Sequence, residues 1–216
     1  MNILTVADFF YPGVTGGASI VIYEVMRRLV TRGHQVKVLI RGQPETPAGM
    51  EGMQVFSYET PGWEALYPLA VGRCFNNLRR LLAEHPIDLI NAHHAFSGIA
   101  AELVRLKRSQ LPSVFFFHGP WHREAMAKEG ILDEGVANSD LAFRYRLRRS
   151  IDRFILKRCT QVVGLSEYMG AEAEQILPGV SGKFCKIPGG VDTHRFRPAG
   201  NRKQVRRQLG LPEDGL

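Results

Sequence analysis

Glycine and polar residues follow several short apolar runs of this sequence, and these are the positions suited to ligand binding. Gly16 and Gly17 lie between the apolar run 3–7 and a segment with helical periodicity. Glycines there let the backbone approach a ligand closely, and a helix amino terminus offers unpaired N–H groups to a phosphate. The alternative is a tight turn that needs glycine only for its backbone angles. The sequence alone leaves both interpretations open.

Histidines follow two further apolar runs. Asn91, His93 and His94 come after one of them, and His118 ends a run of three phenylalanines. A protein core would prefer another apolar side chain at position 118, so the pattern favours a histidine that faces a ligand. A buried structural histidine with a hydrogen-bond partner is the alternative interpretation.

Zinc binding by these histidines, together with the nearby His122, is the metal hypothesis to weigh. Closed zinc sites usually show a regular ligand spacing, and no carboxylate or thiol shares these loops. The adjacent His93 and His94 would also point to opposite sides of an extended chain. We therefore expect no metal site.

Other catalytic patterns are missing from the sequence. It contains no G-x-S-x-G elbow and no Walker glycine-lysine loop, and Ser166 is placed to cap a helix. The spacing from Gly13 to Gly17 is G-x-x-G-G rather than G-x-G-x-x-G, and Arg41, not an acid, follows the second apolar run. An NADP-dependent oxidoreductase remains an alternative, because an arginine can face a 2′-phosphate.

The elements that position these residues are predicted from apolar runs that alternate with helical periods. Strands are expected at 3–7, 36–40, 54–57, 87–90, 114–117, 161–165 and 183–187, and helices at 18–32, 71–84, 99–107, 140–157, 167–176 and 202–209. Apolar strands separated by helices indicate a parallel sheet covered on both faces. The prediction is an α/β fold with a doubly wound, mostly parallel, Rossmann-like sheet, which binds ligands beyond the carboxyl ends of its strands.

Composition indicates a globular protein of the cytoplasm. Hydrophobic residues make up 44% and charged residues 23% of the 216 residues. The three cysteines stand in no metal or redox spacing, which favours buried thiols in a reducing compartment. The first residues lack the basic segment of a signal peptide, and no apolar run reaches the roughly 18 residues of a membrane-spanning helix.

The net charge of +7 comes from two local patches. Residues 140–158 hold seven basic and two acidic side chains. Residues 201–214 hold four basic and two acidic side chains. Four cations of the first patch share one face of a predicted helix: Arg146, Arg149, Arg153 and Lys157. This helix is either a surface helix packed by its apolar side, where we expect Leu147 and Ile155, or a contact with an anionic membrane. A nucleic-acid-binding α/β domain is a third reading of the charge, but no recognisable module with aromatic stacking platforms supports it.

Several motifs occur in an order that is typical of one enzyme family. They are Phe10-Tyr-Pro, Gly16-Gly17, Gly33-His-Gln-Val36, His118-Gly119, Ser166-Glu167-Tyr168 and, most specific of all, Ile187-Pro-Gly-Gly-Val-Asp-Thr-His-Arg-Phe-Arg-Pro198. On these motifs the chain resembles, over essentially its whole length, the group 1 (family 4) retaining glycosyltransferases of GT-B fold. The resemblance implies two facing Rossmann-like domains with the active site in the cleft between them.

The same resemblance assigns regions and residues. Residues 1–198 correspond to the N-terminal, acceptor-side domain, and residues 199–216 to a linker and the start of a C-terminal donor-binding domain. Gly16 and Gly17 would approach the donor phosphates, and His118 would lie beside the transferred sugar.

The implied reaction is transfer of a hexosyl group from a nucleotide-sugar donor to a glycan or lipid-linked acceptor, with retention of configuration, as in polysaccharide biosynthesis. No metal or other cofactor is expected, and the chain is expected to be inactive alone. Its expected partners are the donor, the acceptor and an anionic membrane surface at the inner face of the membrane, without nucleic acid.

Overall fold

A seven-stranded sheet forms the centre of the described part of the chain. The computed structural model describes residues 1–11, 16–42, 52–60, 67–131, 139–194, 196–198 and 200–214. The strands are β1 (Asn2–Ala7), β2 (Gln35–Arg41), β3 (Met53–Tyr58), β4 (Leu89–His93), β5 (Ser113–Phe116), β6 (Gln161–Gly164) and β7 (Phe184–Lys186). Their order is β3-β2-β1-β4-β5-β6-β7, and every described pair is parallel. The predicted α/β, Rossmann-like fold is confirmed.

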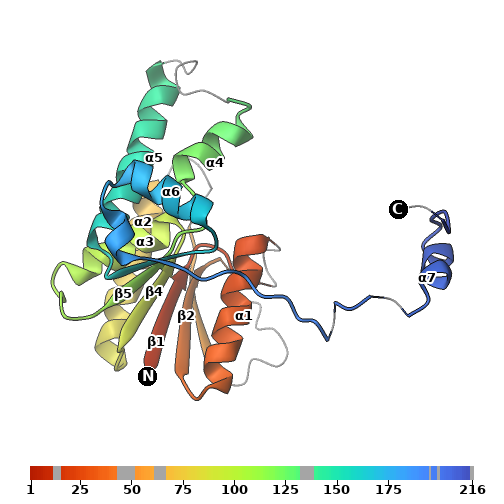
Figure 1. Cartoon of the computed structure of the whole chain (residues 1–216). Helices are drawn as coiled ribbons and strands as arrows, with labels where there is room; N and C mark the ends of the chain where they lie inside the picture. The colour runs from red at the N-terminus through yellow and green to blue at the C-terminus, as the bar shows by residue number, and fades with distance from the viewer. Residues whose placement is uncertain are drawn as a thin grey trace.

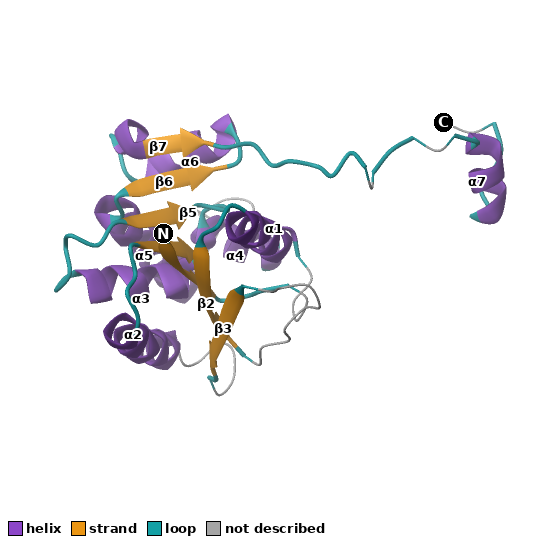
Figure 2. Ribbon diagram, turned by 90° about the horizontal axis from the view of Figure 1, so that it is seen from below, coloured by secondary structure: helices purple, strands orange, loops and turns teal. Residues whose placement is uncertain are grey.

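Helices lie on both faces of this sheet. The described α-helices are α1 (Gly17–Thr31), α2 (Tyr67–Glu84), α3 (Ala95–Arg105), α4 (Trp121–Lys128), α5 (Ser139–Arg158), α6 (Glu167–Ile176) and α7 (Arg202–Gln208), and all but α7 belong to the body around the sheet. Figure 2 shows α2, α3 and α5 side by side on one face, with α1 on the other. Figure 1 shows α4 and the first half of α5 projecting past the carboxyl ends of the strands. None of the described helices is both long and apolar enough to cross a membrane.

The apolar character of the strands follows from burial on both faces. In β1, Leu4 and Val6 pack into the cluster under α2 and α3. Ala7 packs on the other side with Ile22 and Met26 of α1. Successive side chains of a strand point to opposite faces, so a strand covered on both sides must be apolar throughout.

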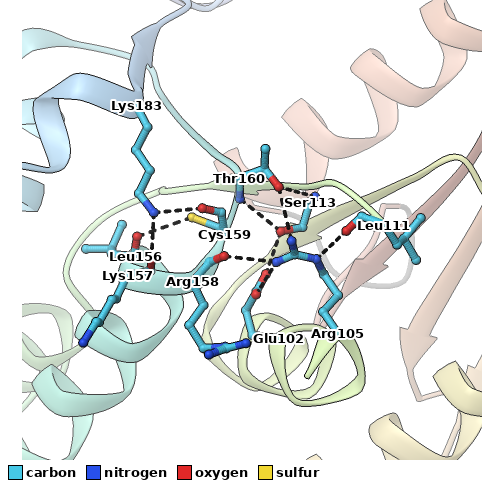
Figure 3. Close-up of polar contacts among 10 residues, drawn as sticks. All are labelled: Glu102, Arg105, Leu111, Ser113, Leu156, Lys157, Arg158, Cys159, Thr160 and Lys183. Atoms are coloured by element: carbon cyan, nitrogen blue, oxygen red, sulfur yellow. Dashed lines mark hydrogen bonds and ion pairs between the residues drawn. The ribbon is translucent and has the colours of Figure 1, made fainter. Parts of the chain in front are cut away.

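A buried polar network ties α3 to the segments that enter β5 and β6 (Figure 3). Arg105 forms an ion pair with Glu102, and the two side chains are 8% and 1% exposed. The Arg105 guanidinium also donates to the carbonyl oxygens of Leu111, at 2.6 Å, and Arg158, at 3.1 Å. Ser113 Oγ donates to the Glu102 carboxylate at 2.7 Å. This network lies at the amino ends of the strands, away from the expected ligand site, and its role is structural.

Three expectations are wrong in detail. Helix α4 is not foreseen, because it is only two turns long and follows directly on Gly119-Pro120. Strand β4 begins at Leu89 and runs to His93, because its pairing with β1 starts at Leu89, so Asn91 and His93 lie inside the strand rather than after it. Cys185 is exposed, whereas Cys74 and Cys159 are buried as expected.

The carboxyl-terminal segment leaves the sheet after β7. An extended stretch leads to α7, which lies apart from the sheet in both overall views. No described residue of α7 is buried, and Leu209 just beyond it is 67% exposed. The boundary at residue 198, and the assignment of residues 199–216 to the start of a further domain, stay predictions.

Candidate functional site

Three histidine rings stack against one another at the carboxyl ends of β4 and β5. His93 is the last residue of β4, His94 follows it, and His118 lies two residues past the end of β5. The His93 and His94 ring centroids are 5.3 Å and 5.5 Å from that of His118. His93 Nδ1 and His118 Nε2 are 3.0 Å apart, a hydrogen-bond distance.

Strand register brings the side chains of His93 and His118 together. Residue His93 is paired with Phe116 in the β4–β5 ladder, and the two rings stack at 5.1 Å. Because side chains alternate along an extended chain, Phe116 and His118 lie on the same side. The ring of His118 therefore lies over Phe116, at 5.5 Å between centroids, and next to His93.

His94 joins the cluster through an unusual backbone conformation. Its φ is 67° and its ψ is 165°, which makes it the one non-glycine residue with positive φ among those described. The expectation that His93 and His94 point to opposite sides is wrong for this reason, since both rings lie against His118. Such a conformation costs about 1–3 kcal/mol and occurs most often at functional sites. The backbone N–H of Asp8 donates to His94 Nδ1 at 3.2 Å, and the Phe9 ring contacts the His94 ring edge-on.

Burial keeps all three imidazoles uncharged near neutral pH. It lowers the pKa of His118 to about 4. Burial, together with the nearby His118 and Arg41, lowers the pKa of His94 to about 3. The pKa of His93 is held well below its ordinary value by complete burial and by the two neighbouring histidines. A neutral imidazole can exchange hydrogen bonds with a ligand hydroxyl but brings no charge to it.

Asp8 is a member of the site that was not assigned a role from the sequence. Its carboxylate accepts hydrogen bonds from the backbone N–H groups of Phe96 and Ser97, at 3.3 Å and 3.1 Å, and so caps α3. Burial raises the pKa of Asp8 to about 7, partly offset by the charge of Arg41 and by those two N–H groups. The signal in the sequence was an acid directly after the first strand.

A pocket of about 480 Å³ opens beside this cluster. Its size lies within the range of about 300–1,000 Å³ that is typical of small-molecule sites. The described residues that line it include His94, His118, Asp8 and Trp121. Acids and bases from α4, from the residue that follows it and from α5 also line it: Glu124, Lys128, Glu129, Arg144, Arg148 and Asp152. His118 is therefore accessible to a ligand although it is largely buried.

The two glycines at the start of α1, Gly16 and Gly17, are not required by the fold of the described chain. Gly16 precedes α1 in an extended conformation, with φ −166°, that any residue adopts. Among the described residues, a Cβ on Gly17 would meet no atom within 4 Å, and one on Gly16 would meet only Ser19 Oγ, at 3.8 Å. The tight-turn explanation therefore has no support at these two positions, while open space beside the helix amino terminus suits a ligand. Neither glycine lines the pocket at His118, Gly13 lies outside the described residues, and binding of donor phosphates stays a prediction.

The basic face of α5 is partly used within the chain. All four of its predicted cations are exposed: Arg146, Arg149, Arg153 and Lys157. Two of them donate to backbone oxygens at the end of α6, Arg149 to Gln175 at 2.8 Å and Arg153 to Ile176 at 3.1 Å. On the apolar side Ile155 is buried as expected, but Leu147 is 49% exposed.

Two simpler expectations concern single residues and metals. Ser166 caps α6 as predicted, since its Oγ accepts from the Met169 backbone N–H at 3.3 Å. Within the described ranges, no group of three or more His, Cys, Asp or Glu side chains is arranged to hold a metal ion.

Fold and site together define a parallel α/β domain of Rossmann-like type, with a ligand pocket at the carboxyl ends of its central strands. The chain belongs to Glycosyltransferase Family 4, whose family model matches residues 15–195.

Curated relatives agree with this assignment. The D-inositol 3-phosphate glycosyltransferase of Nocardiopsis dassonvillei is 29% identical over 212 residues, which cover 93% of this chain and 47% of the relative. The protein of the same name from Thermomonospora curvata is 29% identical over 222 residues, which cover 94% of this chain and 48% of the relative. The chain thus spans about half the length of these relatives.

Solved structures share the fold. Sucrose-phosphate synthase from Thermosynechococcus elongatus superposes with a TM-score of 0.76 at 17% identity, covering 99% of this chain and 53% of that one. HepE from Anabaena, in complex with UDP and glucose, gives a TM-score of 0.65 at 15% identity, covering 97% and 50%.

Proposed function

We propose that this chain is the N-terminal, acceptor-side half of a glycosyltransferase that moves a hexosyl group from a nucleotide-sugar donor to a glycan or lipid-linked acceptor. The observation that carries the proposal is the pocket at His118, located where α/β sheets bind ligands, in a chain of this family. HepE, one of the proteins of similar fold, is described with UDP-glucose, which supports a nucleotide sugar as donor. Family membership favours transfer over the NADP-dependent oxidoreductase and the nucleic-acid-binding alternatives.

The residues present would act by position and by hydrogen bonding. His118, uncharged near neutral pH, would share a hydrogen bond with a hydroxyl of the transferred sugar. The open backbone at Gly16 and Gly17, at the amino terminus of α1, would approach the donor diphosphate. Transfer with retention then proceeds through an oxocarbenium-like transition state, in which dipoles and cations stabilise the leaving diphosphate. No metal is part of this proposal.

In this proposal the donor half lies outside this chain, which is supported by the share of each relative's length, about half, that the chain does not cover. We therefore expect the 216-residue chain to fold and to transfer no sugar, and the whole protein to transfer. The experiment measures transfer of labelled sugar from UDP-glucose and other nucleotide sugars to a panel of glycan and lipid acceptors, with and without excess chelator. Sustained transfer by the chain alone would contradict the assignment of halves. Loss of activity in chelator, restored by a divalent ion, would contradict the metal-free reaction.

A further inference from the structure

A second and larger hollow is lined by residues of α2, α3 and α5. These three helices run side by side on the sheet face opposite α1 (Figure 2). The hollow measures about 1320 Å³. This groove, which we call the α2–α3–α5 groove, exceeds the roughly 300–1,000 Å³ of ordinary small-molecule pockets. Its lining is largely apolar and includes Val71, Phe75, Ile99, Leu103, Leu147 and Ile151. A large groove of this kind suits a long hydrocarbon chain rather than a compact polar ligand.

The charged side chains of the groove have one sign. Six of its described lining residues are basic and none is acidic; the basic ones are Arg79, Arg80, Lys107, Arg108, Arg144 and Arg148. The pocket at His118 is different, because Asp8, Glu124, Glu129 and Asp152 accompany its cations. An apolar groove with arginines around it complements a ligand that joins an apolar chain to an anionic group.

The groove is continuous with the candidate active site. The two cavities share four lining residues: Phe96, Trp121, Arg144 and Arg148. Phe96 packs edge-on against Trp121, with ring centroids 5.0 Å apart. The buried Arg148 guanidinium lies over the same Trp121 ring, 5.3 Å from its centroid. A cation therefore lies at the junction, between the apolar groove and the pocket that contains His118.

We propose that the α2–α3–α5 groove binds the hydrocarbon chain of a lipid-linked acceptor, and that Arg144 and Arg148 bind its phosphate. This inference rests on the proposed glycosyltransferase function and narrows its acceptor from any glycan or lipid to a lipid phosphate. In this arrangement the hydrocarbon chain of the lipid lies in the groove and its phosphate lies at the junction. The accepting hydroxyl group, beyond the phosphate, enters the pocket at His118. Phosphate binding to arginine is charge-assisted and can be bidentate, which fits a fixed position at the junction.

The test is isothermal titration calorimetry of the 216-residue chain with four probes: dodecyl phosphate, octyl phosphate, dodecyl maltoside and inorganic phosphate. We expect dodecyl phosphate to bind most tightly. Each buried methylene contributes about fourfold to affinity, so octyl phosphate should bind at least about tenfold more weakly. Dodecyl maltoside lacks the anionic group, and inorganic phosphate lacks the hydrocarbon chain. Each should therefore bind at least about tenfold more weakly than dodecyl phosphate.

Two matched pairs of variants locate the binding site on α5. Arg144→Gln removes a cation that lines the groove, and Arg146→Gln removes one that does not line it. Leu147→Gln and Phe143→Gln form the apolar pair; both side chains are exposed, 49% and 67%, but only Leu147 lines the groove. All four positions are exposed, so each variant should keep the melting temperature of the parent chain. Arg144→Gln and Leu147→Gln should each weaken the binding of dodecyl phosphate at least about fivefold. The control variants Arg146→Gln and Phe143→Gln should leave this binding unchanged.

Other outcomes would overturn the proposal. Equal affinities for dodecyl phosphate and dodecyl maltoside would indicate an apolar docking surface for a protein segment rather than a binding site for a lipid phosphate. Equal effects within each matched pair would indicate nonspecific binding. If the whole protein transfers sugar to a soluble acceptor while dodecyl phosphate does not bind, the groove proposal fails alone. Specific binding in a whole protein that transfers no sugar would instead contradict the proposed function.

Discussion

His93 Nδ1 lies 3.0 Å from Nε2 of His118. This contact joins a fully buried residue of β4 to the histidine that lines the pocket. The other ring nitrogen of His93, Nε2, has no hydrogen-bond partner among the described residues. With both rings neutral, one proton occupies the shared contact, so the tautomer of one ring determines that of the other. The hydrogen-bonding patterns of His93 and His118 are therefore coupled.

The lowered pKa of His118 predicts how stability depends on pH. Burial lowers the pKa to about 4 from an ordinary value of 6.5, so between these values the unfolded chain binds more protons than the folded one. The free energy of unfolding should then rise with pH across this window and fall as the protein is acidified, with up to about 1.4 kcal/mol per pH unit from one such histidine. His118→Asn should flatten this slope in urea unfolding curves, and the exposed control His194→Asn should not. Equal slopes of unfolding free energy against pH in the parent and in His118→Asn would contradict the lowered pKa of His118.

Gly17 gives a prediction that separates ligand binding from folding. A Cβ added there would meet no atom of the described residues within 4 Å, so we expect Gly17→Val to leave the melting temperature unchanged. It would occupy the space through which the donor diphosphate approaches the helix terminus, so donor affinity and turnover of the whole protein should fall together. Gly182→Val is the matched control, since its added side chain is equally unobstructed. Normal donor affinity in Gly17→Val would remove Gly17 from the site.

The sequence predicted the seven strands because each is an apolar run between helical periods, as Leu4 and Val6 of β1 illustrate. It also predicted His118 as a site residue, because a histidine after three phenylalanines departs from the core pattern. The stacking with His93 was not predictable, since it depends on the register that pairs His93 with Phe116. The positive φ of His94 was also beyond reach, because that conformation is imposed by tertiary contacts and not by local preference.

The buried ion pair between Glu102 and Arg105 should be important for stability. Glu102→Ala leaves the Arg105 charge buried without its partner, which should cost about 3–5 kcal/mol in the free energy of unfolding. Glu24→Ala is the matched control, because Glu24 forms ion pairs with Arg27 and Arg28 on the surface of α1. Exposed pairs of this kind contribute about 0–1 kcal/mol. Urea unfolding of both variants measures the difference, and similar losses would show that the network in Figure 3 is not buried in solution.

Membrane contact by the basic face of α5 is best tested at Arg146 and Lys157. Arg149 and Arg153 already donate to the end of α6, so changing them would disturb the fold as well as the surface charge. Arg146→Glu with Lys157→Glu should weaken binding to anionic vesicles at least about tenfold, since each cation near such a surface contributes about 1 kcal/mol. Vesicle co-sedimentation at low salt is the measurement, with Arg32→Glu, directly after α1, as control. A parent chain that ignores anionic vesicles would leave α5 as a solvated surface helix.

The central claim is that His118 contacts the sugar as it is transferred, and kinetics of His118→Ala in the whole protein test it most directly. Loss of a hydrogen bond that matters most as charge develops should lower kcat by about 30- to 1,000-fold, or about 2–4 kcal/mol. Donor affinity, measured separately by calorimetry with the nucleotide sugar, should change little by comparison. The melting temperature should show that the variant remains folded under the assay conditions. Near-normal turnover in a folded variant would contradict the account, and an activity loss matched by unfolding would make His118 a structural residue.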